Sequence, residues 1–361
     1  MQRNRIDALD LIRFFAAMSV VLYHYISRPS SDAYPLLSEI TKFGYLGVPL
    51  FFMLSGYVIA LSAHNRTAIQ FGISRFVRLY PALWAGVIFT IAVMTIFSQQ
   101  QYSLAQVFAN FTLLNDYMGF RDVDGVYWTL KAELKFYACV FLLLACGVFQ
   151  RYHIWLSAWL CLTITHAVFG QPFFMGWFIS PAYSPFFISG IAYYLIQAYG
   201  NNLFNYSILI LSLIVSSFNG YNQANGFLHS PHIEEKMISV AIIWGFYLLL
   251  YFLSTGVFNI KGKKIYVTMG ALTYPLYLIH NMAGKALIDY YSNFFSERTV
   301  IMSVIFIMIC FSWLMHVIVE KPFSTPIKNY LLKIFGDPRR VYRYDRNGRV
   351  ATRSVASQSS D

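Results

Sequence analysis

The sequence predicts an all-α integral membrane protein with about ten transmembrane helices and both termini in the cytoplasm. Of its 361 residues, 57% are hydrophobic and only 12% are charged. Apolar blocks long enough to cross a bilayer as helices recur from one end of the chain to the other. The basic residues fall between these blocks, so the net charge of +11 indicates membrane topology rather than a nucleic acid partner.

Windows of about 20 residues divide the chain into apolar spans. The ten predicted spans are 8–26, 43–63, 79–98, 127–149, 153–169, 177–198, 203–219, 237–255, 268–291 and 299–319. With a cytoplasmic N-terminus, 18 basic residues fall on the cytoplasmic side and five on the opposite side. The positive-inside rule therefore places both termini inside and the loops 99–126 and 220–236 outside.

The two ends of the chain differ in character. Arg13 interrupts the first apolar block, so we expect a retained first helix rather than a cleaved signal peptide. Residues 336–361 combine low hydrophobicity with a basic bias, which predicts a disordered cytoplasmic tail near anionic lipid headgroups. Residues 1–335 then form one transmembrane domain.

The four cysteines give no sign of a disulfide framework. They all lie inside apolar blocks and no C-x-x-C pair occurs, so we expect them to be packing residues. They are Cys139, Cys146, Cys161 and Cys310. No internal repeat is visible, which disfavours the transporter folds built from two related halves.

Arg13 and His24 are ionisable residues inside the first span. Eleven residues at about 100° each bring both side chains to one stripe of a helix, about 16 Å apart along its axis. Arg13 can be a snorkelling anchor at the interface. His24 lies deeper, where a histidine is suited to moving protons, although a core histidine with satisfied hydrogen bonds is the alternative.

Three further stretches carry polar groups into or beside the membrane. Glu133 stands between Lys131 and Lys135, either buried with partners or solvated at the outer interface. Arg75 and Arg78 lie one turn apart, which suits a phosphate clamp but also satisfies the positive-inside rule. His280 ends the ninth span's "YPLYLIH", and interfacial packing of aromatic residues does not explain it.

Six short motifs follow one another in one order along the chain. Besides Arg13 and His24, they are "FFMLSGY" at 51–57, "SRFVRLYP" at 74–81, "WTLKAELKFY" at 128–137, "YPLYLIH" at 274–280 and "HVIVEKP" at 316–322. The region over which they are distributed comprises about 320 of the 361 residues. This set resembles the acyltransferase-3 family of bacterial membrane-bound O-acyltransferases.

The resemblance implies a fold with a central conduit and an activity. Members of this family move an acyl group, usually acetyl, from cytoplasmic acyl-CoA to a hydroxyl of an extracytoplasmic glycan or lipid-linked sugar. It implies His24 as catalytic base with Arg13 as its companion, and Arg75 and Arg78 near the donor. The other matching motif positions are Ser55, Trp128, Glu133, Tyr277, His280 and Glu320.

The chain departs from the family pattern in two respects. Leu134 and Lys135 stand where many members have a glutamine and a second acid, so Glu133 acts alone or with Lys135. The sequence also shows no fused esterase-like domain or extra spans, so the protein either finishes the transfer itself or hands the acyl group to a separate extracytoplasmic partner.

The expected chemistry needs an acyl-CoA donor and no metal. The arginine pair and the basic loop 261–264 suit CoA phosphates, and Tyr277 and His280 are expected near the donor. His24 either removes the acceptor proton as the hydroxyl attacks the thioester or carries the acyl group itself, which gives ping-pong kinetics. Ser55 offers an acyl-accepting or hydrogen-bonding hydroxyl or, with Gly56, forms a close-packing notch.

Two other classes of protein fit parts of this pattern. A proton-coupled carrier of sugars or lipid-linked precursors would use His24, Glu133 and Lys131 as relay groups. A membrane scaffold or sensor would use the polar spans to bind partner helices. Alignment of charged residues along one helix stripe argues against the scaffold, and consumption of labelled acetyl-CoA separates an enzyme from a carrier.

Overall fold

The chain folds into a bundle of long helices. The structure is a computed structural model that describes residues 2–28, 33–170, 176, 179–257, 263–335, 342–344 and 350–352. The helices up to the middle of the chain are α1 (Gln2–Ile26), α2 (Pro35–Thr41), the 3-10 helix η1 (Lys42–Leu46), α3 (Gly47–Ala63), α4 (Ala68–Ser98), α5 (Leu104–Thr112), α6 (Tyr127–Ala145) and α7 (Tyr152–Phe169).

The second half continues the bundle. Its elements are α9 (Ser184–Tyr199), α10 (Leu203–Phe227), α11 (Ile233–Thr255), α12 (Lys264–Ile279), α13 (Met282–Tyr291), α14 (Glu297–Met315), the π-helical turn η2 (His316–Glu320), α15 (Lys321–Phe335), β1 (Tyr342–Tyr344) and β2 (Val350–Thr352). The two strands pair antiparallel. Within the predicted tail 336–361, the structure describes only these two strands. The disorder of the tail stays a prediction.

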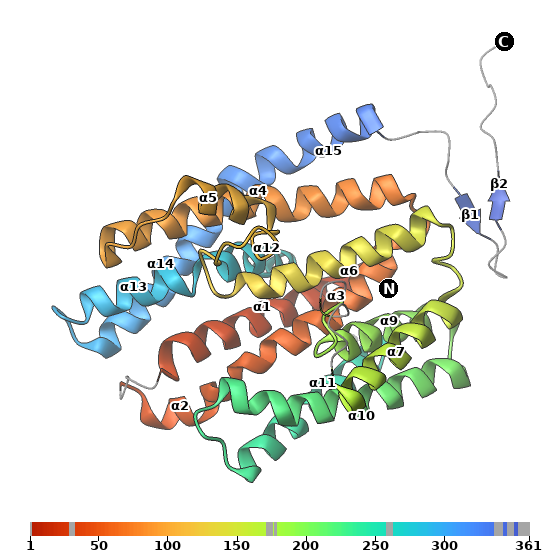
Figure 1. Cartoon of the computed structure of the whole chain (residues 1–361), viewed down its shortest axis with the longest axis horizontal. Coiled ribbons are helices and arrows are strands. Elements are labelled where there is room, and N and C mark those ends of the chain that lie inside the picture. The colour runs from red at the N-terminus through yellow and green to blue at the C-terminus, as the bar shows by residue number, and fades with distance from the viewer. Residues whose placement is uncertain are drawn as a thin grey trace.

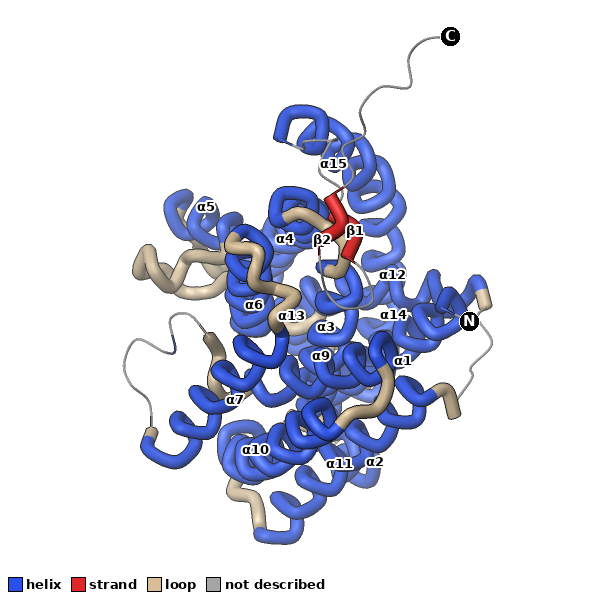
Figure 2. Tube along the Cα trace, turned by 90° about the vertical axis from the view of Figure 1, so that its right-hand side faces the viewer, coloured by secondary structure: helices blue, strands red, loops and turns tan. Residues whose placement is uncertain are grey.

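The long helices run side by side along the longest axis of the molecule (Figure 1). In that view and in the view turned by 90° (Figure 2), α4, α5 and α15 lie on one side and α10 and α11 on the other, with α1, α3 and α9 between them. The start of α4 and α15 lie toward one end of the bundle, and the connection between α10 and α11 lies toward the other (Figure 1).

Helices α3 and α9 form the centre of the bundle. Every residue of α9 from Ser184 to Ile196 is buried, as expected for a helix that is apolar all round. A Cβ on Gly56 would collide with the backbone carbonyl of Phe187, and one on Gly190 with that of Met53. These two glycines therefore allow the helix backbones to touch.

Seven segments of the described chain are long and apolar enough to cross a membrane, by length and composition. They are Ala8–Ile26, Pro35–Ala63, Ala68–Ser98, Tyr152–Phe169, Leu203–Phe227, Ile233–Thr255 and Glu297–Phe335. The other three predicted spans contain helices of a different kind: α6 carries three charges, α9 has 16 residues, and α12 has 16 residues and ends at a break before α13. The protein is thus all-α with several apolar helices, and ten crossings stay a prediction.

Three local expectations need correction. The predicted outer loop 99–126 contains helix α5, and α10 continues to Phe227, which shortens the predicted loop 220–236. All four cysteines are free, and Cys146, Cys161 and Cys310 are exposed on the bundle surface. These three therefore do not pack in the core, because their apolar blocks place them on the outer faces of helices.

Candidate functional site

A cavity of about 650 Å³ lies among α1, α3, α4, α6, α12 and the turn between α14 and α15. It follows α3 from Val48 to Ile59, a distance of about 16 Å at 1.5 Å per residue. Its charged lining residues are Asp10, Arg13, Arg75, Arg78, Glu133, Glu320, Lys321 and Lys328. Cations therefore outnumber carboxylates, which favours an anionic ligand.

The two arginines of α4 face this cavity in different surroundings. The guanidinium of Arg75 lies 5.7 Å from the ring centre of Phe71 and 5.8 Å from that of Tyr137. Its Nε is buried without a hydrogen-bond partner. Arg78 lies 5.6 Å from the ring centre of Tyr274. The aromatic rings hold both planar groups in place by cation–π attraction and leave N–H donors for a ligand.

Glu133 is the centre of a hydrogen-bond network on the cavity wall. The hydroxyls of Ser55 and Tyr137 each donate to its Oε1 at 2.7 Å. Tyr137 stands one turn after Glu133 on α6, so both face the same side of that helix. Lys135 instead donates to the carbonyl of Gly176 at 2.8 Å. Glu133 is therefore hydrogen-bonded to two hydroxyls, and Lys135 is directed to Gly176 instead.

Tyr277 connects the cavity to a pair of histidines. Its ring lines the cavity, and its hydroxyl lies 2.9 Å from that of Thr129. The ring centre of His280 lies 5.4 Å from that of Tyr277 and 5.3 Å from that of His24. Neither histidine lines the cavity itself. Of the two residues predicted to share one face of α1, Arg13 thus lines the cavity and His24 lies beside it.

His280 is held in one tautomer by its surroundings. It is completely buried, its Nδ1 lies 2.9 Å from the carbonyl oxygen of Tyr277, and its Nε2 has no hydrogen-bond partner. A carbonyl oxygen only accepts hydrogen bonds, so the proton is on Nδ1 and the lone pair on Nε2. A buried imidazole with a free lone pair can accept a proton.

The break between α12 and α13 places His280 opposite α1. The hydroxyl of the buried Tyr25 donates to the carbonyl of His280 at 2.5 Å. The carboxylate of Asp124, also completely buried, accepts from Asn281 Nδ2 at 2.7 Å and from the backbone N–H of Met282 at 2.8 Å. Asp124 thereby supplies an acceptor for the first turn of α13 from a loop more than 150 residues away in sequence.

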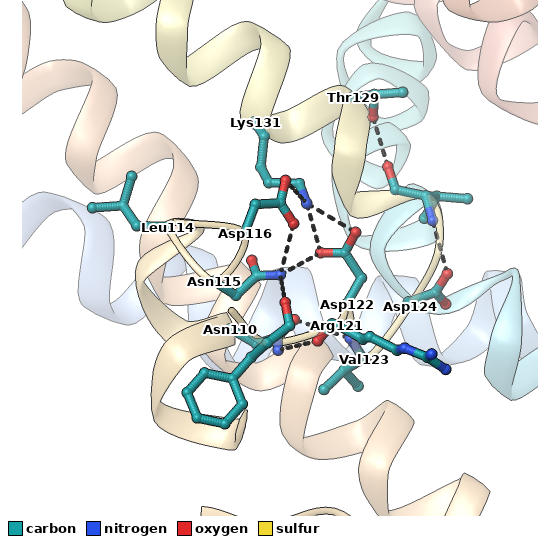
Figure 3. Close-up of polar contacts among 12 residues, drawn as sticks. Asn110, Leu114, Asn115, Asp116, Arg121, Asp122, Val123, Asp124, Thr129 and Lys131 are labelled. Atoms are coloured by element: carbon teal, nitrogen blue, oxygen red, sulfur yellow. Dashed lines mark hydrogen bonds and ion pairs between the residues drawn. The ribbon is translucent and has the colours of Figure 1, made fainter. Parts of the chain in front are cut away.

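The loop that carries Asp124 is fastened to α6 by charged groups (Figure 3). Lys131 Nζ lies 2.6 Å from a carboxylate oxygen of Asp116 and 2.9 Å from both oxygens of Asp122. Burial raises the pKa of the Asp124 carboxyl, and the hydrogen bonds that it accepts oppose this rise. Lys131 therefore has a structural role in fixing the loop.

The π-helical turn η2 brings Glu320 into the cavity. Its side chain is 8% exposed, and its oxygens lie 2.6 Å from His316 Nδ1 and 3.4 Å from a guanidinium nitrogen of Arg78. Single π-helical turns inside α-helices are frequent at functional sites. Glu320 thereby links α14 and α15 to the arginine pair.

The structure brings most predicted site residues together. Those that line the cavity are Arg13, Ser55, Arg75, Arg78, Glu133, Tyr277 and Glu320. His24 and His280 adjoin it through Tyr277, whereas Trp128 does not line it and packs on Tyr183, with ring centres 4.8 Å apart.

Several residues of the site were missed in the sequence. Tyr137 and His316 stand four residues from Glu133 and Glu320, and this helical spacing could have revealed both. Lys321 and Lys328 line the cavity, whereas the predicted donor loop supplies no lining residue among its described members Lys263 and Lys264. Lys261 lies outside the described residues.

Comparison with known families identifies the domain. The model of the acyltransferase-3 family, described as an acyltransferase domain, matches residues 6–317. The chain belongs to the acyltransferase-3 family. The matched range contains the cavity-lining residues of α1, α3, α4, α6 and α12 and His316 of η2, whereas Glu320 and α15 lie beyond it. Among the described residues, no cluster of three or more His, Cys, Asp or Glu side chains could hold a metal ion.

Individual relatives are distant. The chain is 22% identical to a putative acetyltransferase, ORF330, of Acidianus two-tailed virus over 80% of this chain and 86% of that protein. It is 26% identical to nodulation protein 10 of Rhizobium leguminosarum bv. viciae over 37% of this chain and 43% of that protein. It is 34% identical to acyltransferase MdmB of Streptomyces mycarofaciens over 28% of this chain and 26% of that protein.

The matches thus span less than half the length of two of these relatives. No solved structure matches the chain.

Proposed function

We propose that this acyltransferase-3 protein is a membrane O-acyltransferase that uses acyl-CoA, in the simplest case acetyl-CoA. The acceptor is a hydroxyl of an extracytoplasmic envelope glycan or lipid-linked sugar, and the protein resides in a bacterial cytoplasmic membrane. The observation that carries this proposal is the cavity of about 650 Å³, in which cationic side chains outnumber carboxylates and whose wall at Tyr277 adjoins His280 and, through it, His24. The names of two relatives, a putative acetyltransferase and an acyltransferase, agree with it.

The donor end of the proposed site is formed by Arg75 and Arg78. Guanidinium groups bind phosphate through two parallel hydrogen bonds, and the unpartnered Nε of Arg75 offers one such donor. The cavity along α3 then receives the pantetheine arm. Its wall there is largely apolar, with Phe51, Phe52 and Val58, which suits an uncharged chain.

The acceptor end is formed by His24. A neutral imidazole removes the proton of the sugar hydroxyl as its oxygen attacks the thioester carbonyl. The carbon–sulfur bond then breaks, and the CoA thiolate takes up a proton. In this proposal the proton that the CoA thiolate takes up is the one that His24 removed, and His280, whose ring centre lies 5.3 Å from that of His24 and whose Nε2 carries a free lone pair, relays it. Glu133 and Arg13 set the charge around the reacting carbonyl.

A second route uses the same residues. His24 attacks the thioester, carries the acyl group and transfers it to the acceptor, which gives ping-pong kinetics. A separate extracytoplasmic partner can receive the acyl group in either route.

The carrier alternative gains no support from the site. Its relay required Lys131 together with Glu133 and His24, yet Lys131 is paired with Asp116 and Asp122 in the loop. A lysine neutralised by two carboxylates is a poor proton relay.

Labelled acetyl-CoA tests the proposal directly. Inverted membrane vesicles that contain the protein should consume acetyl-CoA and transfer the label to envelope glycan. His24→Ala should lower transfer by about a hundredfold or more, the usual contribution of a general base, while the protein still inserts. A wild-type protein that leaves acetyl-CoA untouched, or a His24→Ala protein with near-normal transfer, contradicts the proposal.

A further inference from the structure

One face of α15 lines the mouth of the cavity. The lining residues of this helix are Lys321, Ser324, Thr325 and Lys328. They follow the spacing i, i+3, i+4, i+7, which is one face of an α-helix. The other face is apolar and exposed, and includes Phe323 and Tyr330 at 52% and 65% exposure. Helix α15 therefore presents its polar face to the cavity.

The two lysines on this face have no carboxylate partner. Within the described chain, neither Lys321 nor Lys328 forms an ion pair, whereas Arg13 and Arg78 are paired with Asp10 and Glu320. Both lysines are exposed, so they lie at the mouth rather than deep in the site. They are seven residues apart, or about 10 Å along the helix, which allows them to contact two separate anionic groups.

Hydroxyl groups complete this surface. Ser324 and Thr325 lie between the lysines on the same face, and hydroxyls commonly donate hydrogen bonds to phosphate oxygens. In the part of the chain that the structure describes, Lys321, Lys328 and Arg75 lack a carboxylate partner, and Glu133 is the one lining carboxylate without a cationic partner, so positive charge remains in excess. This surface is thus complementary to a phosphorylated group that lies at the mouth of the cavity, beyond Arg75 and Arg78.

We propose that the polar face of α15 binds the phosphorylated nucleotide end of the donor. This inference rests on the proposed function, in which Arg75 and Arg78 hold the inner part of CoA. A CoA molecule carries a diphosphate and a 3′-phosphate, and a phosphate monoester bears a charge of about −1.5 to −2 at neutral pH. Lys321, Lys328 and the hydroxyls between them then distinguish CoA from a donor that lacks the nucleotide.

Two donors of different length test this assignment on the purified full-length protein. CoA carries the nucleotide and pantetheine does not, and titration calorimetry measures the binding of each. The test variant is the double substitution Lys321→Gln and Lys328→Gln. The matched control is Lys333→Gln, which removes the same charge from the same helix at an exposed position that does not line the cavity.

The wild-type protein should bind CoA more tightly than pantetheine. The double variant should bind CoA about tenfold more weakly, as expected for two exposed ion pairs, with unchanged affinity for pantetheine. Lys333→Gln should behave as wild type. Salt should weaken CoA binding by the wild type more than by the double variant. Because the lysines are exposed, all three proteins should elute alike in size exclusion.

Three results would overturn the inference. A double variant that binds CoA as tightly as wild type excludes the α15 site and leaves the donor assignment intact. Equal weakening by Lys333→Gln shows that general surface charge, and not this face, attracts CoA. A wild-type protein that binds no CoA removes the donor from the proposed function, and this inference with it.

Discussion

Glu133 accepts two hydrogen bonds on one carboxylate oxygen, and its other oxygen accepts none from the residues that the structure describes, in a cavity rich in cations. An amide oxygen can accept the same two bonds from Ser55 and Tyr137, so Glu133→Gln removes the charge and keeps the network. This substitution therefore separates the electrostatic role of the residue from its structural role.

We expect Glu133→Gln to lower turnover by about a hundredfold if its charge stabilises the reacting groups. CoA binding should stay the same or tighten, because one negative charge leaves the cavity. Steady-state kinetics and calorimetry measure the two effects. Glu320→Gln is the matched control, since it removes the same charge from the same cavity beside Arg78 and His316. Equal losses of turnover in both variants would contradict a specific role for Glu133.

The roles of single residues were only partly accessible from the sequence. The motifs predicted Arg13, Ser55 and Arg75, and the structure places all three on one cavity. The sequence left Lys131 and Lys135 ambiguous, because their partners come from the loop before α6 and from Gly176. A charged residue inside an apolar block indicates that its side chain has a polar partner, but the sequence does not identify that partner.

At the scale of elements, the break between α12 and α13 is the least expected feature. The sequence reads as one apolar span over 268–291, with Pro275 and His280 as the visible interruptions. The structure ends α12 at Ile279 and starts α13 at Met282. The groups that stabilise this break, Tyr25 and Asp124, come from distant parts of the chain, so local patterns could not predict it.

Asp124→Ala should destabilise the protein by about 3 kcal/mol. The substitution leaves the buried donors of Asn281, Met282 and Val126 without an acceptor, at roughly 1–3 kcal/mol for each one that water does not reach. Asp124→Asn should also destabilise, because its NH₂ group faces an N–H donor. Thermal unfolding in detergent measures both.

Asp116→Ala is the control for this experiment. It removes a carboxylate from the same loop, but its side chain is 59% exposed and Lys131 keeps Asp122 as a partner. We expect a cost of about 1 kcal/mol or less. If Asp124→Ala unfolds at the same temperature as Asp116→Ala, the cap on α13 contributes little to the fold.

At the scale of the whole molecule, the proposed mechanism requires a fixed orientation in the membrane. The arginine pair and α15 must reach cytosolic CoA, and the end with the α10–α11 connection must face outward. Single cysteines at Asn225 and Asn329, in a background without the native cysteines, test this arrangement. Both positions are exposed.

An impermeant thiol reagent on intact cells should label position 225 and not position 329. Labelling of both after cell lysis is the control for reactivity. The reverse pattern on intact cells would place Arg75 and Arg78 away from CoA and would refute the donor assignment together with the topology.

The overall architecture was the part most accessible from the sequence, because membrane insertion imposes long apolar helices and a charge bias. Helices occur at all ten predicted spans, and seven of the segments are apolar and long enough to cross by composition. The packing of α9 at the centre was not predictable. It depends on close contacts at Gly56 and Gly190. The sequence offered Gly56 as a close-packing notch, but nothing in it identified α9 and Gly190 as the other side of that contact.

The π-helical turn η2 determines the rotation of helix α15 about its own axis. A π turn contains one residue more than an α-helical turn, and one residue corresponds to a rotation of about 100°. Helix α15 therefore leaves α14 rotated from the direction that a regular helix would have given it. Without the extra residue, α15 would be rotated by about 100° about its axis. Lys321 and Lys328 would then point away from the cavity, and the apolar face that carries Phe323 would rotate with them. A single inserted residue in η2 thus decides which face of α15 lines the cavity.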